Sequence, residues 1–294
     1  MGENPKITVG IVTRNRREKL GKAIQSVYEQ EFPNLEILVV DNASDDGTSE
    51  MLAREYPVIR LLRLEENRGC PGGRNFLYRH ARGEIIVNLD DDGLLGEGAL
   101  SRLVETFFSD PAIGVVAGRL LDLESSIPKN LPDQGWETGI FWAGVSAFRR
   151  KMLEEIGFFP EDFFFFKEEE FLSLKALDAG WRIVYHPGFI VRHPPIRHRA
   201  GEDTRRDYYL FRNPLFVVIE LFPGIYLWKY LFLRIASYAL ISRRRGTFPA
   251  YCRAVGAVPK RLARSLFHRQ PVSKAALRRY FLLRGNLPTP EGEG

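Results

Sequence analysis

Short apolar runs and longer stretches of helical periodicity alternate along the first ninety residues. Four runs are rich in aliphatic and β-branched residues and end in polar ones, which predicts buried strands at residues 7–13, 35–40, 58–64 and 84–89. Apolar residues at helical spacing predict helices between them, over residues 17–30, from Ser44 onward and over 73–82. This alternation is typical of a parallel sheet covered by helices on both faces.

After residue 95 the pattern becomes less regular. It predicts a helix at 97–109, a strand at 113–121, a Pro- and Gly-containing connection at 125–139, a helix ending at Gly180 and a strand at 182–192. We therefore expect an α/β protein whose first half is Rossmann-like and mostly parallel, and whose second half has mixed topology.

Charge is divided unevenly along the 294 residues, of which 45% are hydrophobic. Residues 1–196 hold 23 Lys and Arg against 31 Asp and Glu, whereas residues 197–284 hold 19 against 4. An acidic body with a basic tail suggests chemistry in the first part and an anionic surface as the partner of the second. The length suffices for one large domain, or for a domain with an appendage.

Cysteine usage and the amino terminus bear on localisation. Cys70 and Cys252 offer no CxxC spacing and no disulfide framework, which favours a reducing compartment. Residues 1–6 lack the apolar region of a signal peptide. Together these features predict a cytoplasmic protein.

Three consecutive carboxylates, Asp90, Asp91 and Asp92, follow the fourth predicted strand, and Asp41 ends the second. Ligands of open α/β sheets bind beyond the carboxyl ends of the strands, so these side chains should gather at one crevice. Along an extended chain Asp90 and Asp92 point to one side and Asp91 to the other. Such a pair suits Mg²⁺ or Mn²⁺, which complete their coordination with water and substrate phosphates. A solvated turn is the alternative.

Other ligand sites fit the sequence poorly. An EF-hand anchored on Gly93 or Gly47 would put Ala99 or Ala53 where the bidentate Glu belongs. The segment NRGCPGGRN matches neither the dinucleotide fingerprint nor a P-loop. The sequence also lacks a thiol or HExxH cluster for zinc.

A resemblance to a known family begins with the segment VGIVTRNRREKLGKAIQSVYEQEFPNLEILVVDNASDDGT, which is similar to the opening of the family 2 inverting glycosyltransferases. It continues through ENRGCPGGRN, ARGEIIVNLDDDGLL, GVSAFRRKMLEEIGFF and KEEEFLSLKALDAGWRIVYHPGFIVRH, over about residues 6 to 213. The resemblance implies a GT-A domain at residues 1–206, with a nucleotide-binding half and an acceptor-side half. It also implies metal-dependent transfer of a sugar from a UDP- or dTDP-type donor to a glycan or lipid-linked acceptor.

The resemblance assigns four residues to the nucleotide. Thr13, at the end of the first strand, belongs to the nucleotide pocket, and Asp41 accepts the ring N–H of uracil or thymine. Arg74 resembles the basic residue that reaches the nucleotide. Arg14 departs from the pattern, because many relatives have an aromatic residue there that stacks on the base; Arg also stacks on planar rings.

The carboxylate triplet and a histidine are assigned to the ribose and the metal. Asp90, Asp91 and Asp92 match the DXD motif, with Asp90 toward the ribose and Asp92 on the Mg²⁺ or Mn²⁺ ion. His193 falls where several relatives have a second metal ligand.

Glu168 and Glu169 fall at the Glu-Asp pair whose second member is the family's catalytic base. Glu169 is therefore the expected base and Glu168 the second candidate, although Glu in place of Asp lengthens the reach by one methylene. Phe171 stands where relatives often carry another acid, so no role of that acid is transferred.

Structural alternatives remain open for several of these residues. Asp41 would also serve as a cap before the helix at Ser44, and Arg74 would pair with any neighbouring acid. Residues 168–170 would form a solvated first helical turn. His193 would be structural. For the whole chain, the alternatives are a sugar nucleotidyltransferase and a non-catalytic, membrane-associated nucleotide-sugar-binding module.

Residues 207–294 form a predicted helical, basic and aromatic C-terminal region. Within it residues 215–241 are strongly apolar, but Glu220, Lys229 and Arg234 leave no uncharged stretch near the roughly 20 residues that span a bilayer. Trp and Tyr beside basic residues suit an anionic membrane surface, with a packed subdomain as the alternative. Nucleic acid is not expected as a partner, since no binding motif supports it. We predict a peripheral seat on the inner face of the membrane.

Overall fold

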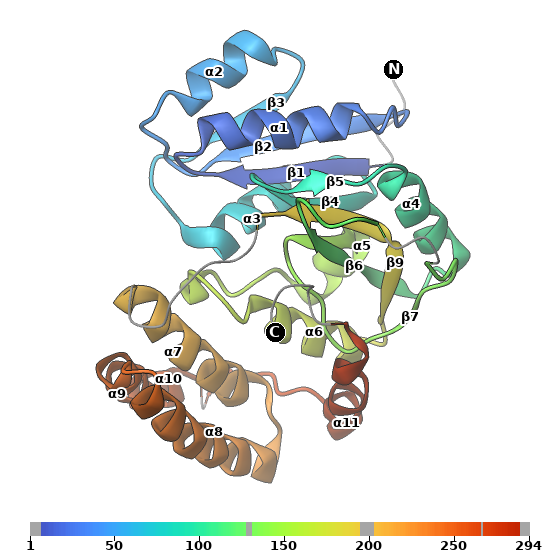
Figure 1. Ribbon diagram of the computed structural model, residues 1–294. Coiled ribbons are helices and arrows are strands. Elements are labelled where there is room, and N and C mark those ends of the chain that lie inside the picture. Colours follow the sequence, from blue (N-terminus) through green and yellow to red (C-terminus); the bar gives the residue numbers. More distant parts are fainter. Residues whose placement is uncertain (1–6, 128–130, 195–202, 266, 289–294) are drawn as a thin grey trace.

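The first half of the chain forms a parallel sheet with helices on both faces. The computed structural model describes residues 7–127, 131–194, 203–265 and 267–288 (Figure 1). Four strands pair in parallel in the order β3-β2-β1-β4. They are β1 (Ile7–Thr13), β2 (Leu35–Asp41), β3 (Arg60–Arg63) and β4 (Ile85–Asp90). The connecting helices are α1 (Arg17–Tyr28), α2 (Thr48–Glu55) and α3 (Gly69–His80). The predicted alternation is confirmed.

Two helix starts differ from their predicted positions. The helix α2 begins at Thr48 rather than at Ser44, because Gly47 adopts a left-handed conformation with a φ of 79° and precedes the first turn. The helix α3 begins at Gly69 and includes glycines that usually weaken a helix. Small residues are required there, since a Cβ on Gly73 would lie 2.6 Å from a methyl of Val12 in β1.

The second half extends the sheet with mixed topology, as expected. The strand β8 (Val145–Arg149) is antiparallel to both β4 and β6 (Ile113–Asp122), and β9 (Arg182–His193) is parallel to β6. The short strands β5 (Leu94–Leu95) and β7 (Trp136–Glu137) are antiparallel to β9. Helices of this half are α4 (Ala99–Ser109), α5 (Arg150–Ile156), a 3-10 turn η1 (Glu161–Phe163) and α6 (Glu168–Asp178).

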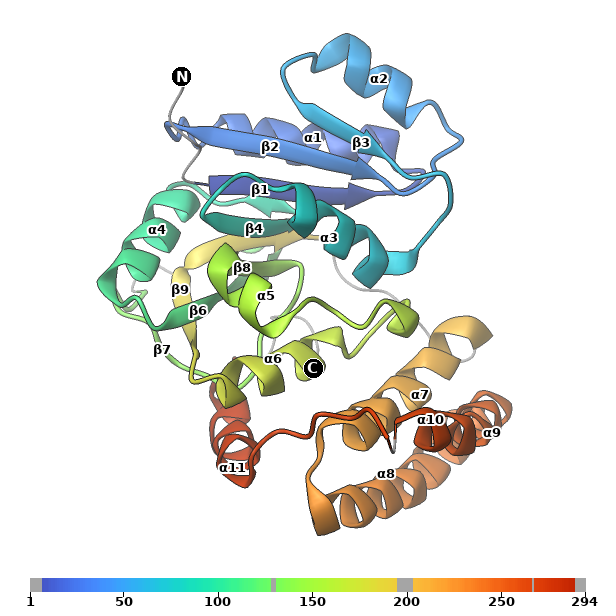
Figure 2. The same cartoon turned by 180° about the vertical axis from the view of Figure 1, so that it is seen from behind.

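The chain after residue 203 is helical. Its elements are α7 (Thr204–Leu221), α8 (Gly224–Arg244), α9 (Phe248–Gly256), α10 (Val258–Ser265), α11 (Lys274–Leu283) and a final 3-10 turn η2 (Arg284–Asn286). Figures 1 and 2 show α7 to α10 at the end of the molecule opposite α2, whereas α11 lies near α6. No helix of the described ranges is long and apolar enough to cross a membrane.

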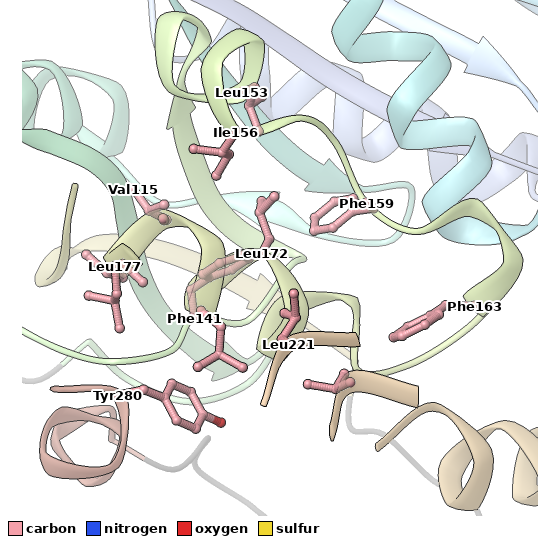
Figure 3. Packing of buried hydrophobic residues seen from close by; sticks show 14 of the residues in the cluster. Val115, Phe141, Leu153, Ile156, Phe159, Phe163, Leu172, Leu177, Leu221 and Tyr280 are labelled. Carbon is pink, nitrogen blue, oxygen red and sulfur yellow. The ribbon is translucent and has the colours of Figure 1, made fainter. Parts of the chain in front are cut away.

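Two apolar clusters cover the two faces of the sheet. Because side chains alternate along a strand, Ile85 and Val87 of β4 face a cluster formed with α1, α2 and α4, while Ile86 faces the other cluster. The cluster that contains Ile86 also includes residues of α3, α5, α6 and much of the C-terminal region. Figure 3 shows Leu221 of α7 and Tyr280 of α11 within it, near Leu172. Residues 207–294 therefore share a core with the mixed half, and a domain boundary at 206 stays a prediction.

Candidate functional site

The ends of three neighbouring strands bring predicted site residues together. In the pairing of β1 with β2, Thr13 is opposite Asp41, and in the pairing of β1 with β4, Val12 is opposite Asp90. The expected gathering of polar side chains at the carboxyl edge of the sheet is thus present.

The chain turns immediately after Asp90. The Gly93 amide donates a 2.9 Å hydrogen bond to the Asp90 carbonyl, so residues 91–92 form a turn instead of continuing the strand. The extended chain assumed for residues 90–92 is therefore wrong, although Asp90 and Asp92 both lie near His193, in agreement with the prediction that they point to one side. The Thr13 hydroxyl donates a 2.8 Å hydrogen bond to Asp91, and burial raises the pKa of Asp91 to about 6.

Two cations at the start of α1 face these carboxylates. Arg16 forms an ion pair with Asp92, and its Nη1 lies 3.5 Å from Asp91 Oδ1. Lys19 Nζ lies 3.2 Å from Asp92 Oδ2. Sequence reasoning missed both residues, although the dense basic run directly after β1, at the amino end of a helix, is the type of signal that marks an anion site.

His193, at the end of β9, joins the same cluster. Its Nε2 lies 3.0 Å from Asp92 Oδ1 and 4.0 Å from Asp90 Oδ2. Burial opposes protonation of the imidazole, but the hydrogen bond and the charge of Asp92 outweigh it and raise the pKa of His193. Burial likewise opposes ionisation of Asp92, yet His193 and Arg16 hold its pKa well below the usual range.

Arg74 connects the strand-end carboxylates to α6. Its buried guanidinium lies 2.9 Å from Asp90 Oδ1 through Nη2 and 3.4 Å from Glu168 Oε1 through Nη1. Burial, together with the charge of Glu169, raises the pKa of Glu168 to about 8 despite Arg74. The other oxygen, Glu168 Oε2, has no hydrogen-bond partner among the described residues.

The three glutamates at the start of α6 are not a solvated turn. Glu168 and Glu170 are 3% and 5% exposed, and only Glu169 is partly exposed. Glu170 forms an ion pair with Arg234 of α8. The alternative of a solvated turn is therefore wrong for Glu168 and Glu170, because both are buried against arginines of α3 and α8.

Asp41 and Arg14 take no part in the ion pairs of Arg16 and Arg74 described above. Asp41 is fully buried, and its carboxylate accepts a 2.8 Å hydrogen bond from the Ser44 amide and another from the Ser49 hydroxyl. Asp41 thus stabilises the turn that precedes α2. This role is similar to the helix cap considered as the alternative for Asp41. Arg14 is exposed directly after Thr13.

Gly144, which sequence reasoning did not select, lies beside Asp90 in the site. A Cβ on Gly144 would lie 2.2 Å from Asp90 Oδ2. Any side chain at this position would displace the carboxylate, so glycine keeps the space beside Asp90 open.

Whether a divalent cation fits depends on Asp92 and His193. The described residues contain no group of three or more His, Cys, Asp or Glu side chains arranged to hold a metal ion. Ligand atoms about 2.1 Å from an octahedral cation lie roughly 3 Å apart, which agrees with the 3.0 Å between Asp92 Oδ1 and His193 Nε2. Asp92 and His193 could therefore supply two protein ligands once the imidazole has lost its proton, with substrate and water completing the coordination.

Comparison with known proteins gives relatives that act on sugars. The chain is 34% identical over 137 residues to a GalNAc(5)-diNAcBac-PP-undecaprenol beta-1,3-glucosyltransferase of Campylobacter jejuni, covering 45% of this chain and 44% of that one. It is 25% identical over 209 residues to the O-antigen chain rhamnosyltransferase RfbN of Salmonella typhimurium, covering 64% and 66%. The chain thus spans between roughly two fifths and two thirds of these relatives' lengths.

Solved structures share the fold over most of the chain. The mannosyltransferase PcManGT of Pyrobaculum calidifontis, in complex with GDP-Man and Mn²⁺, has a TM-score of 0.60 and 26% identity, covering 96% of this chain and 84% of that one. TarS residues 1–349 of S. aureus, in complex with UDP-GlcNAc, have a TM-score of 0.65 and 17% identity, covering 87% and 81%. The fold is therefore that of the GT-A glycosyltransferases.

The family model for "Glycosyl transferase family 2" matches residues 8–159, which include the strand ends and the carboxylate triplet. This match covers more than half of the 294 residues. The protein belongs to glycosyl transferase family 2.

Proposed function

We propose that this protein transfers a sugar from a nucleoside-diphosphate donor to an acceptor hydroxyl, with inversion at the anomeric carbon. The observation that carries the proposal is the meeting of Arg16, Lys19 and Arg74 with Asp90, Asp92 and Glu168 at the carboxyl edge of the sheet. Cations of this kind suit a diphosphate, and carboxylates suit a divalent ion and a proton acceptor.

The diphosphate would lie between α1 and the turn after β4. Arg16 and Lys19 pair with Asp92 and are free to exchange that carboxylate for phosphate oxygens, since both lie at the accessible start of α1. Asp92 and His193 would hold Mg²⁺ or Mn²⁺, and such an ion would supply positive charge to neutralise the departing diphosphate. The Mn²⁺ of the PcManGT complex supports this choice of ion.

Glu169 is the proposed base. Its carboxylate takes the proton of the acceptor hydroxyl as the oxygen of that hydroxyl bonds to the anomeric carbon and the bond from this carbon to the diphosphate breaks. Glu168 suits the role less, because its pKa of about 8 keeps it largely protonated at neutral pH and Arg74 holds one of its oxygens. Glu168 instead supports Arg74 beside the donor.

The proposed donor carries uracil or thymine, as UDP- or dTDP-sugar. Asp41 lies next to Thr13 across the strand pairing, where a base would bind beyond the sheet. Its oxygens retain lone pairs beside the Ser44 and Ser49 contacts, so they accept a ring N–H. Since Asp41 is fully buried, the turn at residues 42–47 must move to admit the base.

A screen of nucleotide sugars tests this function. Purified protein is incubated with UDP-, dTDP- and GDP-sugars and Mn²⁺, and release of the nucleoside diphosphate is measured. The expected result is slow hydrolysis of a UDP- or dTDP-sugar that ceases in excess EDTA. Hydrolysis of no donor would overturn the enzyme proposal, whereas preference for a GDP-sugar would overturn only the assignment of Asp41.

The proposed acceptor is a glycan or a lipid-linked glycan at the inner face of a membrane. The name of the Campylobacter relative includes an undecaprenol-linked substrate. In this chain α7 is largely buried, but α8 exposes a row of apolar side chains, among them Ile225 at 72%, Trp228 at 55% and Phe232 at 71%. Exposed Lys229 lies in the same row, and Arg243 and Arg244 end the helix. An apolar face with basic neighbours suits an anionic bilayer surface.

A further inference from the structure

The loop before the proposed base has an unusual backbone. Phe164, Phe166 and Lys167 have φ values of 58°, 65° and 68°, in the left-handed region that side chains other than glycine rarely adopt. Such a conformation is unfavourable for residues with a Cβ, which approaches the following carbonyl oxygen too closely. Three of them within four positions require compensating contacts from the surrounding structure.

One side chain of α7 supplies many of these contacts. The amide nitrogen of Asn213 donates to the carbonyl of Phe163 at 3.0 Å, to that of Phe166 at 2.8 Å and to that of Phe165. Asn213 is fully buried. Because its amide group carries two hydrogens, at least one is shared between two carbonyls.

Neighbouring residues fix the orientation of this amide. Arg212 Nε donates a 2.9 Å hydrogen bond to Asn213 Oδ1, and a further nitrogen of Arg212 donates to the Asp162 carbonyl. With its oxygen already accepting from Arg212, the side chain presents only nitrogen to the loop. The Cys70 amide of α3 also donates a 3.0 Å hydrogen bond to the Phe164 carbonyl of this loop. The loop is therefore held between α3 and α7.

This arrangement determines where α6 begins. Lys167 is the last left-handed residue, and Glu168 and Glu169 follow it directly as the first residues of the helix. Arg74 of α3 contacts Glu168 at 3.4 Å, so the loop must end at one position for that contact to form. Packing of Phe163 against Phe171 and against Phe216 of α7 anchors the other end of the loop.

We infer that Asn213 is a positioning residue for the proposed reaction: it holds residues 163–167 in the conformation that places Glu168 against Arg74 and Glu169 at the acceptor side. The inference rests on the proposed function for its catalytic meaning. Asn213 itself contacts backbone carbonyls only, so its effect on turnover passes through the two glutamates.

The test compares Asn213→Asp with a control on the same helix. The aspartate keeps the shape and the oxygen that Arg212 contacts, but it faces the loop carbonyls with an acceptor. Asn213→Ala is the second variant, since it removes the bonds without repulsion and covers failure of the first to fold. Val218→Ala, buried in α7 five residues beyond Asn213, is the control for a general loss of stability.

Three readouts separate positioning from folding. At a similar melting temperature, we expect amide exchange in peptides covering residues 163–170 to accelerate at least tenfold in the Asn213 variants and to change little in Val218→Ala. UDP binding by calorimetry should stay within about threefold. The kcat for the nucleotide sugar that the wild type hydrolyses should fall at least tenfold while KM is unchanged.

The outcomes distinguish the two proposals. If exchange in this segment is the same in the Asn213 and Val218 variants, the loop contact is refuted. If exchange accelerates but kcat does not fall below that of Val218→Ala, the positioning role is refuted. Absence of donor hydrolysis by the wild type would refute the proposed function, while the exchange result still decides the contact.

Discussion

The guanidinium of Arg74 and the carboxyl of Glu168 lie 3.4 Å apart although 94 residues separate them in sequence. Through this contact the amino end of α6 is joined to the carboxyl edge of the parallel sheet, since Arg74 also contacts Asp90. This contact fixes the start of α6, which carries the proposed base Glu169, relative to the proposed donor site.

Burial of Glu168 predicts a pH-dependent stability. Its pKa is about 8 in the folded protein and near 4.5 when exposed. The unfolded chain therefore releases this proton at lower pH than the folded one, and the contribution of Glu168 to stability falls as pH rises from about 4.5 to about 8. Glu168→Gln removes that dependence. The melting temperature of Glu168→Gln minus that of the wild type should therefore increase between pH 5 and pH 8. A difference that stays constant or decreases would contradict the raised pKa of Glu168.

Glu169→Gln should abolish transfer without abolishing donor binding. The amide keeps the shape of the side chain but accepts no proton, and a positioned base contributes about 10²–10⁴ in rate. Steady-state turnover and calorimetric UDP binding measure the two effects separately. Glu154→Gln, an exposed residue of α5, is the control. Near wild-type turnover in Glu169→Gln would refute the assignment of Glu169 as the base.

Asp92→Asn should remove metal-dependent activity while the fold persists. The substitution replaces a charged ligand by a neutral one and loosens the contacts with Arg16 and His193. Turnover is measured against Mn²⁺ and Mg²⁺ concentration, and circular dichroism monitors the fold. Asp110→Asn, which removes a comparable ion pair with Arg182, is the control. Undiminished wild-type turnover in excess EDTA would refute the metal requirement.

The proposed membrane-binding surface is the exposed apolar face of α8, so the test changes residues on that face. Deleting residues 207–294 would uncover the shared core, so point changes are preferable. The double variant Trp228→Glu, Phe232→Glu should lose sedimentation with phosphatidylglycerol vesicles, because acidic groups replace the apolar contact and repel the surface. Wild-type binding should weaken as salt rises.

The control for this experiment changes two exposed apolar residues elsewhere. Val58 and Phe108 are 84% and 54% exposed and lie outside the C-terminal region. Glutamate at both should leave vesicle binding intact. Failure of the wild type to sediment at low salt would refute the membrane proposal, with no consequence for the glycosyltransferase proposal.

The local pattern of apolar residues predicted the parallel half of the sheet well. Features that depend on long-range contacts were not predicted. Thr13, Asp41 and Asp90 were expected together because parallel strands end at one edge. The turn at residues 91–92 was missed, since a turn beginning at Asp90 is not visible in an apolar pattern. The role of Asn213 depends on carbonyls about fifty residues away, and no local pattern encodes such a partner.

The charge run at the start of α6 shows the same limit. A row of glutamates usually lies in solvent, and the burial of Glu168 and Glu170 depends on Arg74 and Arg234. These arginines come from helices distant in sequence on either side of α6. Only the folded chain shows that Glu168 and Glu170 have these partners.

The stereochemistry of donor cleavage tests the central claim most directly. With the nucleotide sugar that the screen identifies and Mn²⁺ present, proton NMR of the first-formed product reports the anomeric configuration before mutarotation. Attack by the acceptor or by water on the face opposite the diphosphate predicts inversion, so an α-linked donor gives a β product that Glu169→Gln forms at least a hundredfold more slowly. A product that retains the donor's configuration would contradict the mechanism.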